Sequence, residues 1–150
     1  MLEVEKVLKK KNPPYKIIHF KEKAISAKDV VKHSNVNKDE ICKTIIVKDK
    51  KRNFYACFLK GNNMVDKDKL RSILGSKISI ATPKNVREIA KVNPEEVCPV
   101  LLKIKIFVDE KVTKLKKVNF GSGDLYHGIE MKLEDLLKVL YDYEIKEISL

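Results

Sequence analysis

Hydrophobic positions near the N-terminus follow helical spacing first and strand spacing afterwards. Val4, Val7 and Leu8 lie on one helical face, and the prolines at positions 13 and 14 end that predicted helix. Residues 15–20 are typical of a strand. The pattern therefore predicts that the chain opens with a helix followed by a strand.

Two polar residues mark the starts of the next predicted helical segments. Ser26 followed by Asp29 resembles a capping box, and it predicts a short helix with Val30 and Val31 on its buried side. Asn37 predicts a further helical turn, because asparagine is a favoured N-cap residue. Both segments precede the most strand-like part of the sequence.

The central region predicts a hairpin. Residues 43–48 and 54–59 are rich in β-branched and aromatic side chains, and the polar segment 49–53 separates them. They are predicted to pair as antiparallel strands, with a turn over residues 60–63.

The second half of the chain mixes helices and strands without strict alternation. A helix from Asp66 to Gly75 buries Leu70, and Thr82 followed by proline starts another helix that runs to Ala90. The other predicted elements are a strand over 78–81, a loop over 93–99, strands over 102–108 and 117–120 separated by a turn at 109–110, a strand over 127–131 and a last helix with Leu133, Leu136, Leu137 and Leu140 inward.

These elements indicate one α+β domain covering residues 1–150, with six or seven strands and four or five short helices. A chain of 150 residues is about one domain long. No apolar run approaches the roughly 18 residues that a membrane helix needs, and no signal peptide is evident, so we expect a cytoplasmic protein.

The net charge of +11 is distributed unevenly along the chain. The first 120 residues carry 29 basic and 14 acidic side chains, whereas the last 30 carry 3 and 7. Such a balance favours a polyanionic partner such as nucleic acid. Only three of the 32 basic residues are arginine, and lysine-rich usage also occurs in thermophiles or under nucleotide-composition bias, so charge alone does not decide the function.

The three cysteines and three histidines show no metal-ligand spacing. We therefore expect buried cysteines in a reducing cytosol, and no metal or other cofactor. A cysteine–histidine nucleophile formed by spatial proximity stays open.

Two features stand out as candidate chemistry. Lys43 begins an apolar strand, where its ammonium either binds a carbonyl or phosphate oxygen or simply extends to solvent. Gly121, Gly123 and Gly128 lie within eight residues, which favours either a close approach to a ligand or a plain hairpin turn. Neither segment has the spacing of a P-loop or a dinucleotide fingerprint.

The order of these motifs along all 150 residues resembles the YbaK/ProX family, the prolyl-tRNA-editing and aminoacyl-tRNA deacylase domain. The Lys43-Thr44 pair at the head of an apolar strand carries the resemblance most sharply, supported by a strand that leads into the Asn119-Phe120-Gly121 loop. The resemblance implies a mixed, barrel-like sheet surrounded by helices. It also implies hydrolysis of the ester of mischarged tRNA, in trans or as an insertion in prolyl-tRNA synthetase.

The same resemblance assigns site residues. It implies that Lys43 contacts the aminoacyl ester, with neither metal nor covalent nucleophile, and that aminoacylated tRNA is the partner, with an aminoacyl-tRNA synthetase as a further candidate. Asp124 and His127 are candidates to orient water or the ribose, or else belong to a surface turn. The implied pocket walls are Thr44, Gly61, Pro99, Asn119, Gly121, Ser122 and Gly123.

Two departures from the family pattern leave alternatives open. Glu95 and Glu96 stand where the family usually has glycines before a proline, and Lys60 stands where it commonly has proline. The Glu95-Glu96 departure leaves a non-catalytic RNA-binding module on the same fold as an alternative. The acidic C-terminal helix and tail leave a protein-interaction domain as another. The lysine clusters at 9–11 and 50–52 are expected either to bind tRNA phosphates or to be solvated faces.

Overall fold

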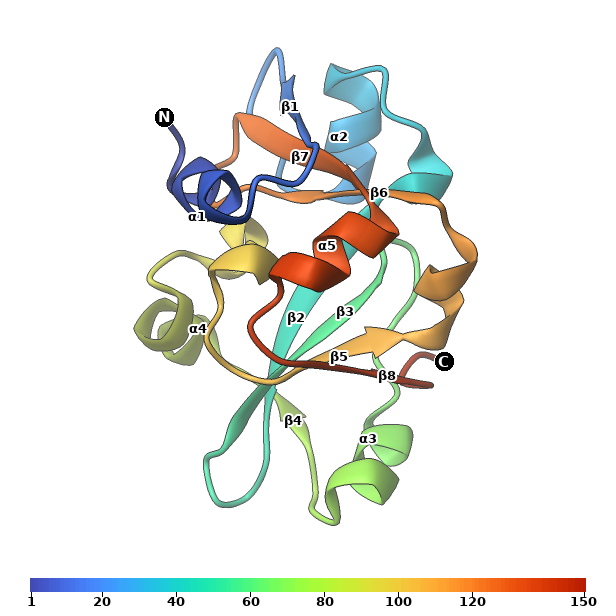
Figure 1. The fold of residues 1–150 in the computed structure, drawn as a ribbon. Coiled ribbons are helices and arrows are strands. Elements are labelled where there is room, and N and C mark those ends of the chain that lie inside the picture. Colours follow the sequence, from blue (N-terminus) through green and yellow to red (C-terminus); the bar gives the residue numbers. More distant parts are fainter.

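The hairpin of β2 (Cys42–Lys48) and β3 (Phe54–Lys60) forms the centre of a five-stranded sheet in the computed structural model, which describes residues 1–150 (Figure 1). The hairpin is antiparallel, as predicted, with Thr44 opposite Phe58. The strand order is β4-β2-β3-β5-β8, in which β5 lies parallel to both of its neighbours. The other strands of this sheet are β4 (Ser79–Ile80), β5 (Ile106–Asp109) and β8 (Tyr143–Lys146).

A second, three-stranded sheet lies above one end of the first (Figure 1). It has the order β1-β7-β6 and is antiparallel throughout, with strands β1 (Lys16–His19), β6 (Lys117–Gly121) and β7 (His127–Lys132). A single parallel bridge between Ile41 and Asn119 joins the two sheets. The α+β class is confirmed, but eight strands in two sheets replace the barrel-like sheet that was expected.

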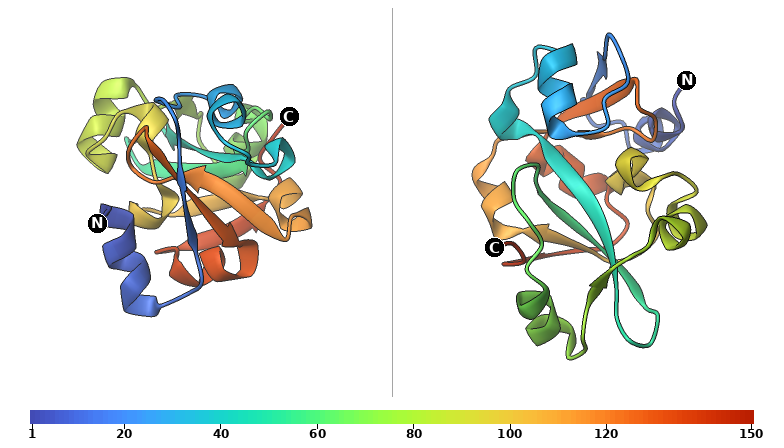
Figure 2. Two further views of the ribbon diagram at one scale, coloured as in Figure 1. Left: turned by 90° about the horizontal axis from the view of Figure 1, so that it is seen from above. Right: turned by 180° about the vertical axis from the view of Figure 1, so that it is seen from behind.

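Five α-helices surround the sheets, and Figure 2 shows them from above and from behind. Their predicted caps are present: Ser26 Oγ accepts from the Asp29 amide at 3.2 Å, and Thr82 Oγ1 accepts from the Asn85 amide at 3.2 Å. Asp66 caps the third helix in the same way. The helices are α1 (Glu3–Lys11), α2 (Ala27–His33), α3 (Lys67–Leu74), α4 (Pro83–Ala90) and α5 (Leu133–Val139).

Alternating side chains of the central hairpin fill two cores, one on each face of the five-stranded sheet. On β3, Phe58 belongs to the larger core, whereas Cys57 and Leu59 face the smaller one. Leu70 of α3 closes the smaller core and is fully buried. The larger core continues upward to the three-stranded sheet through Phe120, whose ring packs edge-on against Phe58 at a centroid distance of 6.1 Å.

Three local predictions are corrected. The strand expected over 102–108 is confined to β5, because the chain before Ile106 enters from a 3-10 helix, η3 (Pro99–Leu101). The turn expected at 109–110 is a longer 3-10 helix, η4 (Glu110–Lys114). Val30 of α2 is only half-buried and Val31 is exposed, because α2 covers a pocket rather than a packed core. No helix has the length and apolar character to cross a membrane.

Candidate active site

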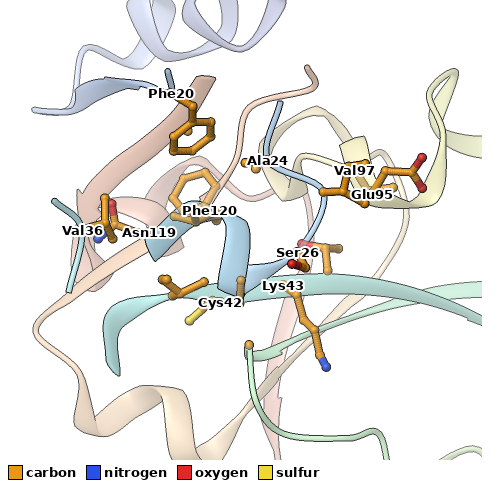
Figure 3. Close-up of a pocket in the computed structure, with 18 of the residues that line it drawn as sticks. Phe20, Ala24, Ser26, Val36, Cys42, Lys43, Glu95, Val97, Asn119 and Phe120 are labelled. Carbon is orange, nitrogen blue, oxygen red and sulfur yellow. The ribbon is translucent and has the colours of Figure 1, made fainter. Parts of the chain in front are cut away.

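A pocket of about 430 Å³ opens between the three-stranded sheet, α2 and the first residues of β2 (Figure 3). Phe20, which follows β1, and Phe120 of β6 form its aromatic end. Its volume falls in the range of roughly 300–1,000 Å³ that small-molecule sites occupy. Much of the remaining lining is aliphatic and comes from Ile18, Ala24, Val30, Val36, Ile41 and Val97.

Close backbone packing builds the pocket walls, and two glycines permit it. The Phe20 amide donates to the Tyr126 carbonyl oxygen at 2.9 Å, which ties the segment after β1 to the loop before β7. A Cβ atom on Gly128 would lie 2.9 Å from the Phe20 ring. One on Gly121 would lie 3.0 Å from the Val97 carbonyl oxygen. A larger residue at either position would displace a wall, which accounts for the clustering of these glycines.

Lys43 lines the pocket from β2, where it pairs with Leu59 across the hairpin. Its side chain is half-buried and makes no ion pair or hydrogen bond with the protein. Burial lowers the pKa of the Lys43 ammonium, and no neighbouring carboxylate offsets that cost. Figure 3 shows the side chain extending from β2 away from Phe20 and Phe120. The ammonium is therefore a free donor for a ligand oxygen, on the side of β2 away from the aromatic rings.

Two buried polar side chains in the pocket wall lack hydrogen-bond partners. Thr44 is 7% exposed and Asn119 is 4% exposed, and both line the pocket. The Thr44 Oγ1, Asn119 Nδ2 and Asn119 Oδ1 atoms accept or donate no hydrogen bond. A buried polar group without a partner costs about 1–3 kcal/mol, so these three atoms leave hydrogen-bonding capacity unused in the pocket wall at a cost in stability.

An aspartate–histidine pair lies at the pocket, with Asp124 in the loop between β6 and β7 and His127 at the start of β7. His127 Nδ1 lies 3.0 Å from both carboxylate oxygens of Asp124. Ser122 Oγ donates to the His127 carbonyl oxygen at 2.7 Å and accepts from the Asp124 amide at 3.3 Å, which braces the loop. The ring of His19 packs edge-on against His127 at a centroid distance of 5.0 Å. Asp124 thus fixes the orientation of the imidazole, as a positioned acid–base group requires.

Cys42 is the only cysteine in the pocket lining. Burial raises the pKa of its thiol to about 12, so the thiolate is essentially absent at neutral pH. The histidine at the pocket, His127, has its Nδ1 engaged by Asp124. The arrangement therefore favours a pocket without a cysteine nucleophile.

The structure brings most of the predicted site residues together. Three lie behind the lining: Pro99 is buried at the start of η3, Ser122 braces the loop, and Gly123 adopts a φ of 106° beside Leu101. The seven that line the pocket are Lys43, Thr44, Gly61, Asn119, Gly121, Asp124 and His127.

Sequence reasoning missed the wall that residues 18–36 contribute. Phe20, Val30 and Val36 carry no polar signal and are indistinguishable from core residues in the sequence. Ser26 was interpreted only as a helix cap, although it also lines the pocket.

The acidic loop that departs from the family pattern lies at the rim of the pocket. Glu95 is exposed, and Figure 3 shows its carboxylate turned away from Phe20 and Phe120. Glu96 Oε1 accepts from the Asn93 amide at 3.3 Å, so this carboxylate braces its own turn. Neither acid enters the aromatic end of the pocket.

The sequence matches the family model described as aminoacyl-tRNA editing domain over residues 21–139. This is most of the chain, and it includes every pocket residue except Ile18 and Phe20. The chain therefore belongs to the aminoacyl-tRNA editing domain family.

Solved structures share the fold over nearly the whole chain. The hypothetical protein APE2540 superimposes with a TM-score of 0.89 at 22% identity, covering 98% of this chain and 99% of its own. A proposed trans-editing enzyme for prolyl-tRNA synthetase gives a TM-score of 0.85 at 19% identity, covering 98% and 94%. A scaffold redesigned to present linear epitopes gives 0.86 at 17% identity, covering 98% and 94%. At these identities the likeness establishes the fold alone.

Proposed function

We propose that this chain is a trans-editing aminoacyl-tRNA deacylase, which hydrolyses the ester between an incorrect amino acid and the terminal ribose of tRNA. The observation that carries the proposal is the half-buried, unpartnered Lys43 in a ligand-sized pocket of an editing-family domain. The similarity to a proposed trans-editing enzyme for prolyl-tRNA synthetase supports the prolyl type of editing. Aminoacylated tRNA and a synthetase are the proposed partners, and the cytoplasm the proposed location.

An aminoacyl ester needs little catalytic power, because it is already activated. In the proposed reaction a water molecule adds to the ester carbonyl carbon, the bond from that carbon to the ribose oxygen breaks, and the ribose oxygen takes up a proton from the water to become a hydroxyl. Free amino acid and tRNA result. Lys43 stabilises the oxyanion that forms on the carbonyl or holds the terminal adenosine, and its charge acts strongly because the pocket is partly desolvated.

The remaining polar groups are proposed to position the substrate. Thr44 and Asn119 offer one hydroxyl and one carboxamide whose hydrogen-bonding capacity the protein itself does not use. Asp124 and His127 orient water or the ribose from the other side of the pocket. Gly61 and Gly121 contribute backbone to the walls, whereas Pro99, Ser122 and Gly123 shape the loops behind them.

The small apolar side chain of Cys42 in the lining favours a small acyl side chain. Val36 and Val97 line the same pocket. Cys57, by contrast, packs in the smaller core on the other face of the sheet and has no part in the pocket. An acyl side chain too large for the pocket would have to displace Phe20 or Phe120.

A panel of tRNAs, each carrying a different amino acid, tests the proposal. The protein is mixed with each one and loss of the ester is followed with time. Faster ester loss than in buffer for one or a few small amino acids is expected. Binding of tRNA without any ester loss would instead identify a non-catalytic RNA-binding module, and neither binding nor hydrolysis would favour the protein-interaction alternative.

A further inference from the structure

A second hollow, rich in cations, lies at the turn of the β2–β3 hairpin. It is formed by the hairpin turn together with the segment that leads into β4. Lys50, Arg52 and Lys77 are exposed around it, and Lys48 contributes a fourth cation from the end of β2. Asp49 is the one acidic residue in this lining.

The carboxylate of Asp49 is already occupied by the turn itself. Its Oδ1 accepts from the Lys51 and Asn53 amides at 2.9 Å, and its Oδ2 accepts from Asn53 Nδ2 at 3.0 Å. These hydrogen bonds, led by those from Asn53, lower the pKa of Asp49. Asp49 therefore organises the turn and forms no ion pair with the surrounding cations.

Hydrogen bonds fix the backbone around the hollow and one of its four cations, Lys48. The Lys50 amide donates to Ser76 Oγ at 3.3 Å, which ties the hairpin turn to the loop before β4. Lys48 Nζ donates to Asn85 Oδ1 at 3.3 Å, which ties the end of β2 to α4. The backbone of Arg52 is fixed in the left-handed region with a φ of 64°. The charged groups thus stand on an ordered framework, and not on a loose terminus.

The hollow lies at the opposite end of β2 from the candidate active site. Lys43 and Lys48 are five residues apart on this strand, which corresponds to about 17 Å at about 3.3 Å per residue. Figure 1 shows the hairpin turn and β4 at one end of the molecule, with α2 and the three-stranded sheet at the other. A ligand that occupies both places must be long and must carry negative charge.

We infer that this hollow binds phosphates of the tRNA whose aminoacyl end occupies the Lys43 pocket, an inference that rests on the proposed function. Lysines and an arginine spread over a turn suit a chain of regularly spaced phosphodiesters better than a single anion. These contacts recognise only the negative charge of the phosphates. They strengthen tRNA binding without affecting which amino acid is removed.

The test compares two variants with equal loss of charge. Lys50→Gln/Arg52→Gln removes two of the four cations of the hollow and keeps side chains with similar backbone preferences. Lys114→Gln/Lys116→Gln neutralises two exposed lysines between β5 and β6, away from the hairpin (Figure 1). The Kd for uncharged tRNA is measured by fluorescence anisotropy between about 50 and 200 mM salt, a range over which phosphate contacts change affinity steeply.

The hairpin variant is expected to bind tRNA about tenfold more weakly, and its salt slope is expected to fall by about one for each lost contact. The control variant should change Kd less than about twofold. Single-turnover ester loss at saturating protein should be the same in both variants and in the wild type. Equal weakening by the two variants, or an unchanged salt slope, would overturn the inference. If the wild type hydrolyses no ester, the proposed function fails, while the Kd comparison still decides whether the hollow binds RNA.

Discussion

Replacing Lys43 by alanine separates catalysis from stability in this pocket. The side chain has no ion pair and no hydrogen bond, and burial alone lowers its pKa, so removing it takes away no stabilising polar contact. One oriented donor to a developing oxyanion contributes about 3–4 kcal/mol, or a factor of roughly 10²–10³ in rate. Lys43→Ala should therefore slow single-turnover deacylation at least about a hundredfold, while the urea midpoint of unfolding stays constant or rises.

The contributions of Lys43 to stability and to the deacylation rate both change with pH in a defined direction. The folded-state pKa of Lys43 lies below its ordinary value, so the folded state disfavours the charged form and this lysine costs stability at neutral pH. That cost disappears as pH rises through the lowered pKa toward the ordinary one. The rate ratio of wild type to Lys43→Ala should decline over the same range, because a neutral amine stabilises an oxyanion poorly.

The matched control is Lys60→Ala. Lys60 is also half-buried, ends β3 opposite Cys42 and lies outside the pocket lining. Lys60→Ala therefore removes the same charge from the same hairpin as Lys43→Ala does. Its deacylation rate should stay within about threefold of the wild type. Near-normal turnover by Lys43→Ala, or equal losses in the two variants, would refute the reasoning that Lys43 acts through direct contact with the substrate.

Three further predictions test the surroundings of the site. Thr44→Val removes an unpartnered buried hydroxyl, so thermal unfolding should show stability unchanged or raised by up to about 1 kcal/mol, while deacylation falls. Asp109 is fully buried and accepts from Ser149 Oγ at 2.6 Å and the Ile148 amide at 3.1 Å, so Asp109→Ala should cost about 1–3 kcal/mol in urea unfolding. Burial raises the pKa of all three cysteine thiols to about 12, so iodoacetamide at about pH 8 should label them only after unfolding.

Local signals in the sequence predicted the elements that depend on local chemistry. The caps at Ser26, Asn37 and Thr82 and the central hairpin follow from side-chain hydrogen bonds and β propensity, which neighbouring residues determine. β8 was missed although its four residues alternate between apolar and polar, and all four of its side chains are exposed in the structure. Its pairing with β5 depends on a partner 37 residues away along the chain.

The candidate site was predictable only in its polar part. Lys43, Asn119 and His127 drew attention because polar residues next to apolar strands and glycine loops are unusual, and all three line the pocket. Phe20 and Val36 could not be predicted, because an apolar side chain that faces a pocket has the same sequence pattern as one that faces a core. The pocket forms where the two sheets approach each other, and the bridge that joins them, between Ile41 and Asn119, is long-range and leaves no local signal in the sequence.

The central claim is that this one pocket holds the aminoacyl end of tRNA with Lys43 against it. The most direct measurement is the NMR shift perturbation caused by an aminoacyl-adenosine analogue in which a stable amide replaces the ester. Saturable shifts centred on Lys43, Thr44 and Asn119 are predicted, with binding weakened at least about tenfold by Lys43→Ala. Shifts confined to another surface, or binding of equal strength in the Lys43→Ala variant, would contradict the account.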